Sequence, residues 1–417
     1  PVKLRLALHL DGQPTLDVLD QDAFELPLRN VVRNGRSVRF EAPIPGGRFV
    51  GEFSADGKLL EGWWTQRNGE LPIRFVPGNL RPQERRPPFP YAAKLVVVRG
   101  GPVRLAGTLT LPRTPGPHAA VVLVSGSGPQ DRNGTVSGHR PSLVWADFLT
   151  RRGFAVLRCD DRGVGGSTGK LLDSTENDFA ADLLAQVRYL KRRKEIDPAR
   201  IGVLGHSEGA AIAALAASTS PELAFAVLLS GPAIPGDQIL AAQSERIARA
   251  MGIPDPLAAR NREIQRRLFA LARSGAGKPQ IAAALERETA GLPAEEAAVV
   301  KGQLAGQLDV AASRWFRSVL DFDPRPVLAL VRCPVLALYG SLDLQAPADL
   351  NAPAMRSALP AARVEVLPGL NHMLQRAETG SPVEYTRIDE TVAPEVLEMV
   401  GDWLRARYLT APSRSRL

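Results

Sequence analysis

The sequence predicts an α/β domain with a mostly parallel sheet and a helical insertion, preceded by a small all-β domain. Three observations predict this architecture. Residues 1–76 have the pattern of short strands separated by turns, apolar strands then alternate with helices, and a purely helical stretch interrupts this alternation once. A chain of 417 residues is long enough for two or three domains.

The first segment, residues 1–76, has the pattern of an antiparallel sheet or half-barrel. Val2–Leu10 alternates apolar and polar residues, and Asn34-Gly35 and Asp56-Gly57 are dipeptides typical of hairpin turns. No helical periodicity interrupts these strands. The Pro-rich stretch at residues 77–90 then predicts a semi-rigid linker.

Residues 91–235 and 332–417 are predicted to form one α/β domain. After a hairpin around Gly100-Gly101, nearly continuous apolar strands alternate with helices, which is typical of parallel strands buried on both faces. The predicted strands are Ala119–Val124, Phe154–Cys159, Ile201–Leu204, Ala226–Leu229, Val335–Tyr339 and Arg363–Leu367, and the predicted helices are Pro141–Arg152, Ser174–Lys194, Ala210–Ala217 and Pro394–Arg407.

Between residues 236 and 331 this alternation stops. The segment is predicted to be helical at Ile239–Met251, Leu257–Ser274, Gln280–Thr289, Ala294–Leu308 and Ala312–Leu320. We interpret the insertion as a lid over a substrate pocket, with simple packing or an oligomer surface as the alternatives.

Composition excludes several classes of protein. No apolar run approaches the ~20 residues of a membrane-spanning helix. The net charge of +8 arises from dispersed basic residues without a nucleic-acid-binding motif, so no nucleic-acid partner is predicted. Cys159 and Cys333 are expected to be free thiols because their strands are not predicted neighbours. No Cys, His and carboxylate spacing indicates a metal site, and no cofactor is predicted.

The strongest local signal is the elbow motif Gly205-His206-Ser207-Glu208-Gly209, between a strand and an Ala-rich helix. In this context the G-x-S-x-G pattern predicts a tight turn that exposes a nucleophilic serine, here Ser207. The glycines are needed because side chains near the turn would collide with the backbone.

A serine nucleophile needs a base that is oriented by an acid. Among five histidines, His372 follows a predicted strand at the end where parallel sheets carry their chemistry, and His139 is the alternative. The acid is expected between serine and base in the chain. Asp343 follows a late strand and is preferred over Asp349, which is expected to open a helix.

Two donors are expected to bind the oxyanion of a tetrahedral intermediate. We predict the backbone N–H groups of Glu208 and of Ser127, the latter in a Gly-rich loop after an early strand; a simple Gly-rich turn is the alternative. This loop lacks the Lys-Ser/Thr of a phosphate-binding P-loop. Asp161 or Arg162, in a second Gly-rich loop, is predicted to brace the site through an ion pair.

Five motifs follow one another in the order of a known family. They are Ser125–Gly134 (SGSGPQDRNG), Asp161–Ser167 (DRGVGGS), Ile196–Gly202 (IDPARIG), Gly205–Gly209 (GHSEG) and Gly369–His372 (GLNH). Over residues 91–409 the chain resembles the α/β-hydrolase superfamily, and within it bacterial serine carboxylesterases of the dienelactone-hydrolase-like or serine aminopeptidase S33-like group. The all-β domain is similar to the lipocalin-like N-terminal region of some of these esterases.

The resemblance implies an α/β-hydrolase fold with a helical lid, Ser207, Asp343 and His372 as a catalytic triad, and Ser127 and Glu208 as the oxyanion hole. In that family a histidine is commoner where this chain has Ser125, a change that leaves backbone donors in place.

The function predicted from these residues is hydrolysis of small-molecule esters with short to medium acyl chains, through an acyl-enzyme. The alternatives are a peptidase or aminopeptidase, or a thioesterase or acyltransferase, on the same triad. A lipid- or glycan-binding protein without activity is a further alternative. The chain starts without an initiator methionine, and the resemblance to esterases that are often exported slightly favours a periplasmic or secreted protein over a cytoplasmic one. The oligomeric state, monomer or homodimer, stays open.

Overall fold

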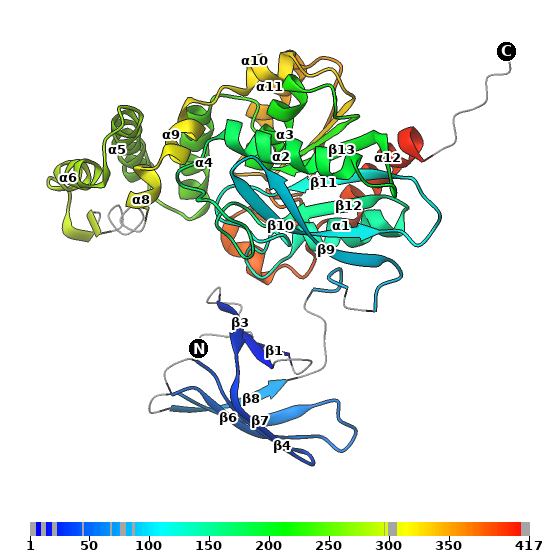
Figure 1. Ribbon diagram of the computed structural model, residues 1–417. Coiled ribbons are helices and arrows are strands. Elements are labelled where there is room, and N and C mark those ends of the chain that lie inside the picture. The colour runs from blue at the N-terminus through cyan, green and yellow to red at the C-terminus, as the bar shows by residue number, and fades with distance from the viewer. Residues whose placement is uncertain are drawn as a thin grey trace. The chain divides into compact units, whose positions relative to one another are not determined.

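The computed structural model describes residues 6–9, 14–18, 23–43, 46–66, 69–75, 81–85, 88–295, 297–298 and 307–409. The chain divides into two compact units (Figure 1). The β unit comprises Pro1–Gln83 with the short segments Val136–His139 and Tyr385–Asp389. The sheet unit comprises Glu84–Thr135, Arg140–Glu384 and Glu390–Leu417.

The β unit contains two antiparallel sheets that share one apolar core. Alternate residues of its central strands point inward, and the buried rings of Phe40 and Phe49 stack with centroids 5.0 Å apart. The strands are β1 (Leu6–His9), β2 (Thr15–Val18) and β3 (Ala23–Pro27) in one sheet and β4 (Arg29–Asn34), β5 (Ser37–Glu41), β6 (Arg48–Phe53), β7 (Leu60–Gln66) and β8 (Gly69–Phe75) in the other. The predicted strand Val2–Leu10 lies partly outside the described residues.

The sheet unit is built on eight strands in the order β16-β15-β14-β13-β11-β12-β10-β9. From β16 to β12 every neighbouring pair is parallel, whereas β10 is antiparallel to both β12 and β9. The strands are β9 (Ala92–Gly100), β10 (Val103–Leu111), β11 (His118–Val124), β12 (Ala155–Cys159), β13 (Ile196–His206), β14 (Ala226–Leu229), β15 (Val335–Gly340) and β16 (Arg363–Leu367). The prediction of a mostly parallel sheet preceded by small antiparallel sheets is confirmed.

Helices cover both faces of this sheet, which explains why its inner strands are apolar throughout. One face packs against α1 (Pro141–Arg151) and α12 (Pro394–Tyr408). The other face packs against α2 (Glu176–Lys191), α3 (Glu208–Thr219), α10 (Pro324–Ala329) and α11 (Ala348–Ala358). A short 3₁₀ helix, η2, spans Pro382–Arg387. No helix among the described residues is both long and apolar enough to cross a membrane.

Strand β13 is longer than its sequence predicts. It begins at Ile196 rather than Ile201 and continues to His206, and its pairing with β11 shifts register near its start. In the sequence, Asp197-Pro198 has the pattern of a turn. In the structure, the irregular pairing with β11 accommodates the proline within the strand. Cys159 and Cys333 are both free, and β12 and β15 are not neighbours.

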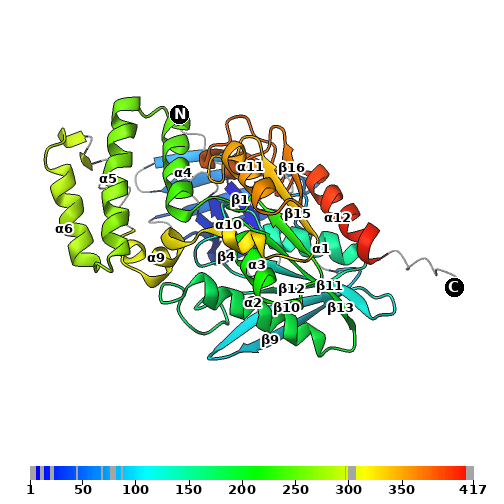
Figure 2. The same ribbon diagram turned by 90° about the horizontal axis from the view of Figure 1, so that it is seen from above.

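The helical insertion lies between β14 and β15. It contains α4 (Gly236–Ala250), α5 (Asp255–Arg273), α6 (Lys278–Thr289), α8 (Leu308–Ala311) and α9 (Arg314–Asp321). Figures 1 and 2 both show α5 and α6 at one side of the sheet unit, beyond α4 and α9. The insertion has an apolar core of its own that includes Leu268, Ile281 and Leu320. The predicted helix Ala294–Leu308 falls largely outside the described residues.

Candidate active site

Ser207 occupies the turn between β13 and α3, in a backbone conformation that side chains rarely adopt. Its φ of 56° and ψ of −124° are strained values for a non-glycine residue. The turn is tight because a Cβ atom at Gly205 would lie 2.1 Å from the carbonyl oxygen of Gly209, and one at Gly209 would lie 2.3 Å from that of Ser125. The backbone N–H of Ser207 donates to the carbonyl of Leu229 on β14, at 2.9 Å. The sheet therefore imposes the strained turn.

His372 and Asp343 form a buried pair at the ends of β16 and β15. The Nδ1 atom of His372 lies 3.0 and 2.9 Å from the two carboxylate oxygens of Asp343. Asp343 also accepts backbone hydrogen bonds from Gln345 and Ala346 at 2.8 and 2.7 Å. Burial alone would raise the pKa of Asp343, but His372 and these N–H groups outweigh it, and the pKa lies below its ordinary value. The pair therefore favours an ionised carboxylate facing Nδ1.

The alternative residues lie elsewhere. Asp349 is exposed on the first turn of α11, where it accepts from Arg246 at 2.6 Å. His139 is buried in the β unit with its Nε2 atom 2.8 Å from the carbonyl oxygen of Tyr385, and burial lowers its pKa to about 3. Neither contact resembles the His372–Asp343 pair.

Two residues that the sequence did not identify hold the backbone of His372. The Nε2 atom of His206 lies 2.8 Å from the carbonyl oxygen of His372, and the hydroxyl of the fully buried Ser230 donates to the same oxygen at 3.0 Å. The His206 and His372 ring centroids are 4.8 Å apart. Burial and the neighbouring His372 lower the pKa of His206 to about 4, so the ring is neutral near pH 7. In the described part of the chain the Ser207 hydroxyl makes no direct hydrogen bond, and His206 is what joins the elbow to His372.

The predicted oxyanion loop lies directly against the elbow. A Cβ atom at Gly126 would lie 3.2 Å from the Cβ of Ser207, so this loop can approach closely only with glycine there. The carbonyl of Ser127 accepts from the side-chain amide of Gln130 at 3.3 Å, which fixes the loop internally. The N–H of Glu208 is the first of α3 and has no acceptor within the helix.

Asp161 and Arg162 contact different parts of the unit. Asp161 accepts from the hydroxyl of Ser125 at 3.1 Å and from the backbone N–H of Gln130 at 3.0 Å, at the two ends of the oxyanion loop. Burial raises the pKa of Asp161 to about 7, against these hydrogen bonds. Arg162 instead donates to Asp182 of α2 at 2.6 and 3.0 Å. Asp161 thus holds the loop, and Arg162 holds α2.

A mostly parallel sheet, a strained serine turn after a central strand and a buried His–carboxylate pair at the same sheet edge define an α/β-type hydrolase. A sequence model of the alpha/beta hydrolase family matches residues 121–384, more than half of the chain, and the chain belongs to this family. The prediction of an enzyme with this fold is confirmed.

The chain is also similar to individual proteins. Esterase EstD of Thermotoga maritima is 27% identical over 329 residues, which cover 76% of this chain and 68% of the esterase. An uncharacterized protein of Mycobacterium tuberculosis is 34% identical over 137 residues, which cover 33% of this chain and 45% of that protein. Among solved structures, the Pyrococcus furiosus esterase Pf2001 aligns with 76% of this chain and 93% of its own, at 19% identity and a TM-score of 0.43.

Proposed function

We propose that the protein is a carboxylic ester hydrolase that works through an acyl-enzyme on Ser207, with His372 as general base and Asp343 as its orienting acid. The observation that carries this proposal is the buried His372–Asp343 contact at the sheet edge where the strained turn presents Ser207. The similarity to the esterase EstD supports an ester rather than another acyl compound as substrate.

In this mechanism Asp343 engages Nδ1 of His372, which leaves Nε2 as the nitrogen for proton transfer. His372 accepts the proton of the Ser207 hydroxyl as its oxygen attacks the ester carbonyl. The N–H groups of Glu208 and Ser127 bind the resulting oxyanion. The alcohol leaves with the proton from His372, and water activated by the same base then releases the acid.

The immediate surroundings of His372 suit this role. Because the pKa of His206 is lowered, its ring is neutral and places no positive charge beside the base. The two hydrogen bonds to the carbonyl of His372 fix the backbone of His372. We propose substrates with short to medium acyl chains. An aminopeptidase needs an acidic group that binds the α-amine of its substrate. Glu208, the carboxylate next to Ser207 in the sequence, already accepts from Trp315 at 2.6 Å, which weakens the aminopeptidase alternative.

The test is turnover of p-nitrophenyl acetate and butyrate by wild type and Ser207→Ala, with labelling by a fluorophosphonate. Loss of a triad member is expected to lower kcat/KM by ~10⁴-fold or more. The matched control is Ser274→Ala, which removes an exposed hydroxyl at the end of α5 and leaves turnover unchanged. Wild-type kcat/KM in Ser207→Ala would disprove the mechanism. Faster turnover of aminoacyl anilides than of alkyl esters would favour the peptidase.

A further inference from the structure

The side chain of Glu208 joins the elbow to the insertion. The indole N–H of Trp315, on α9, donates to a carboxylate oxygen of Glu208 at 2.6 Å. The backbone N–H of Trp315 donates to the carbonyl of Leu172 at 3.1 Å. Trp315 is 8% exposed, so its indole is largely shielded from solvent, and Glu208 is half-buried. This hydrogen bond brings a helix from the insertion to the residue that directly follows Ser207.

The same carboxylate faces the oxyanion loop. Glu208 lines one pocket together with Ser125, Gly126 and Gly128 of that loop. Burial raises the pKa of Glu208, whereas the hydrogen bond from Trp315 and the nearby Ser127 side chain lower it by stabilising the charge. Glu208 and Ser127 are also the two residues whose backbone N–H groups we propose as oxyanion donors. Glu208 is therefore hydrogen-bonded to helix α9 and lies beside the oxyanion loop.

A second carboxylate attaches the same face of α9. Ser318 is three residues after Trp315, so the two side chains lie on one side of the helix. The Ser318 hydroxyl donates to Glu176, which is 3% exposed and begins α2. The charge of the neighbouring Glu208 adds to burial in raising the pKa of Glu176 to about 8. Helix α9 is thus seated on α2 and α3 through the carboxyl groups of Glu176 and Glu208.

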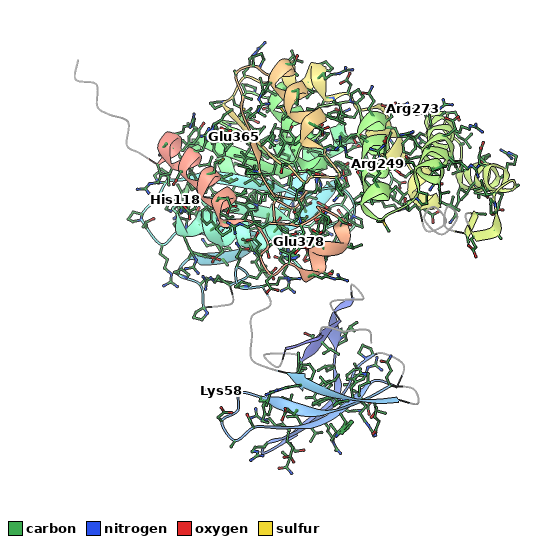
Figure 3. All side chains as sticks on the ribbon, turned by 180° about the vertical axis from the view of Figure 1, so that it is seen from behind. Lys58, His118, Arg249, Arg273, Glu365 and Glu378 are labelled. Carbon is green, nitrogen blue, oxygen red and sulfur yellow. The ribbon has the colours of Figure 1, made fainter. Side chains whose placement is uncertain are left out.

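The far end of α9 is fixed to the rest of the insertion. Arg273, labelled in Figure 3, donates to the side chain of Asp321 at 2.9 Å and to the carbonyl of Leu320 at 2.6 Å. It also donates to Asp237 of α4 at 3.1 Å. These contacts join α4 and α5 to α9, the helix that contacts Glu208.

We propose that Glu208 is a positioning residue, through which the seating of α9 by Trp315 sets the position of Ser127 in the oxyanion hole. When Trp315 occupies its place, its N–H fixes the carboxylate, and the carboxylate fixes the Ser127 side chain and with it the loop. The inference rests on the proposed function. It adds a dependence of the chemical step on a helix that is remote from Ser207 in the sequence.

The position of oxyanion donors matters because each one acts mainly in the transition state and is worth about 10²–10³-fold in kcat. A loop that is loosened but still in place loses part of this contribution to kcat. We expect Trp315→Phe, which keeps the ring and removes the N–H, to lower kcat for p-nitrophenyl acetate by about 10-fold, as for one buried hydrogen bond to a charged group. KM changes little, because the ground state gains least from the oxyanion donors.

The matched control is Trp403→Phe. Trp403 belongs to the same unit, is 4% exposed, and its indole N–H has no hydrogen-bond partner among the described residues. The same chemical change at this position should leave kcat within about 2-fold of wild type. A thermal unfolding curve for each variant separates a loss of seating from a loss of folded protein.

The decisive experiment is a double-mutant cycle on kcat and on the rate of fluorophosphonate labelling. Ser127→Ala removes the hydroxyl and keeps the backbone donor. If both contacts act through Glu208, Ser127→Ala with Trp315→Phe lowers kcat about as much as either change alone, about 10-fold rather than 100-fold. Ser127→Ala with Trp403→Phe shows no such coupling. Glu208→Gln, which keeps an oxygen acceptor, stays within about 3-fold of wild type, whereas Glu208→Ala matches the double variant.

Two results would overturn the inference, and they are distinguishable. An active wild type with additive effects of Ser127→Ala and Trp315→Phe would leave the proposed function intact and remove the coupling. A folded wild type that neither hydrolyses esters nor labels would disprove the proposed function and the inference with it.

Discussion

The sheet edge that carries Ser207 and the helical insertion beside it are held by different kinds of contact. At the sheet edge, backbone groups meet so closely that Gly209 admits no Cβ atom, and the carbonyl of His372 accepts two buried hydrogen bonds. In the insertion, Arg273 and other charged side chains join the helices near the surface. Exposed ion pairs contribute about 0–1 kcal/mol each. The comparison indicates that close backbone contacts set the geometry of the sheet edge, whereas the surface ion pairs of the insertion add only small increments of stability.

The largest expected effect is a loss of activity when Asp343, the proposed acid at the sheet edge, is changed. Asp343→Asn keeps the shape of the side chain but removes the charge that fixes the His372 tautomer, and kcat for p-nitrophenyl butyrate should fall by ~10⁴-fold. Asp349→Asn is the control, because this carboxylate is exposed and pairs with Arg246. A similar loss in both variants would contradict the assignment of Asp343.

A smaller effect is expected from paired glycine substitutions in the two regions. Gly209→Ala forces a Cβ atom to within 2.3 Å of the Ser125 carbonyl, so the elbow must shift and kcat should fall by about 10²-fold or more. Gly275→Ala in the insertion meets nothing within 4 Å, although its φ of +83° favours glycine. It should cost about 1 kcal/mol of stability and leave kcat unchanged. Equal kcat in both variants would remove the contrast between the regions.

The smallest expected effect concerns the carboxyl group by which α2 holds α9. The pKa of Glu176 is raised from 4.5 to about 8 in the folded protein, so the folded state binds this proton more tightly than the unfolded state between those values. The stability that this proton contributes is complete below pH 4.5 and is lost as the pH rises through 8.

Glu176→Gln should therefore flatten this dependence while keeping an acceptor for Ser318. Between pH 5 and 8 the wild type should lose about 1–3 kcal/mol of unfolding free energy relative to the variant, since one pKa unit corresponds to about 1.4 kcal/mol. The raised pKa of Asp161 acts in both proteins and largely cancels in the difference. Parallel curves of unfolding free energy against pH would contradict the seating of α9 on a protonated Glu176.

Much of the fold could be predicted because its signals are local. Apolar strands such as Ala226–Leu229 are buried at all four positions, as a strand covered on both faces requires. The early residues of β13 were missed because Asp197-Pro198 has the pattern of a turn, and the pairing with β11 that includes Ile196 is a long-range contact. The lid interpretation of the insertion stays a prediction.

In the candidate site, too, the residues with local sequence signals could be predicted and those placed by long-range contacts could not. The elbow around Ser207 was predictable because its glycines and its strand–turn–helix context lie within one short segment. In the sequence, Asp343 was preferred over Asp349 only because it follows the expected end of a strand. In the structure the two differ because Asp343 contacts His372, whereas Asp349 contacts Arg246. No sequence signal indicated that Ser230 would hold the His372 carbonyl, since a serine after a strand has many possible environments.

The sequence by itself determined the order of strands and helices along the chain, the turn at Ser207 and the chain order of the three candidate residues Ser207, Asp343 and His372. These features follow from side-chain periodicity and from turns that only certain residues allow. The tertiary structure alone decided which side chains meet across more than a hundred residues, such as Trp315 with Glu208 and Ser318 with Glu176. The physical reason is that such hydrogen bonds depend on where the chain returns after the insertion, and packing of the whole unit sets that path.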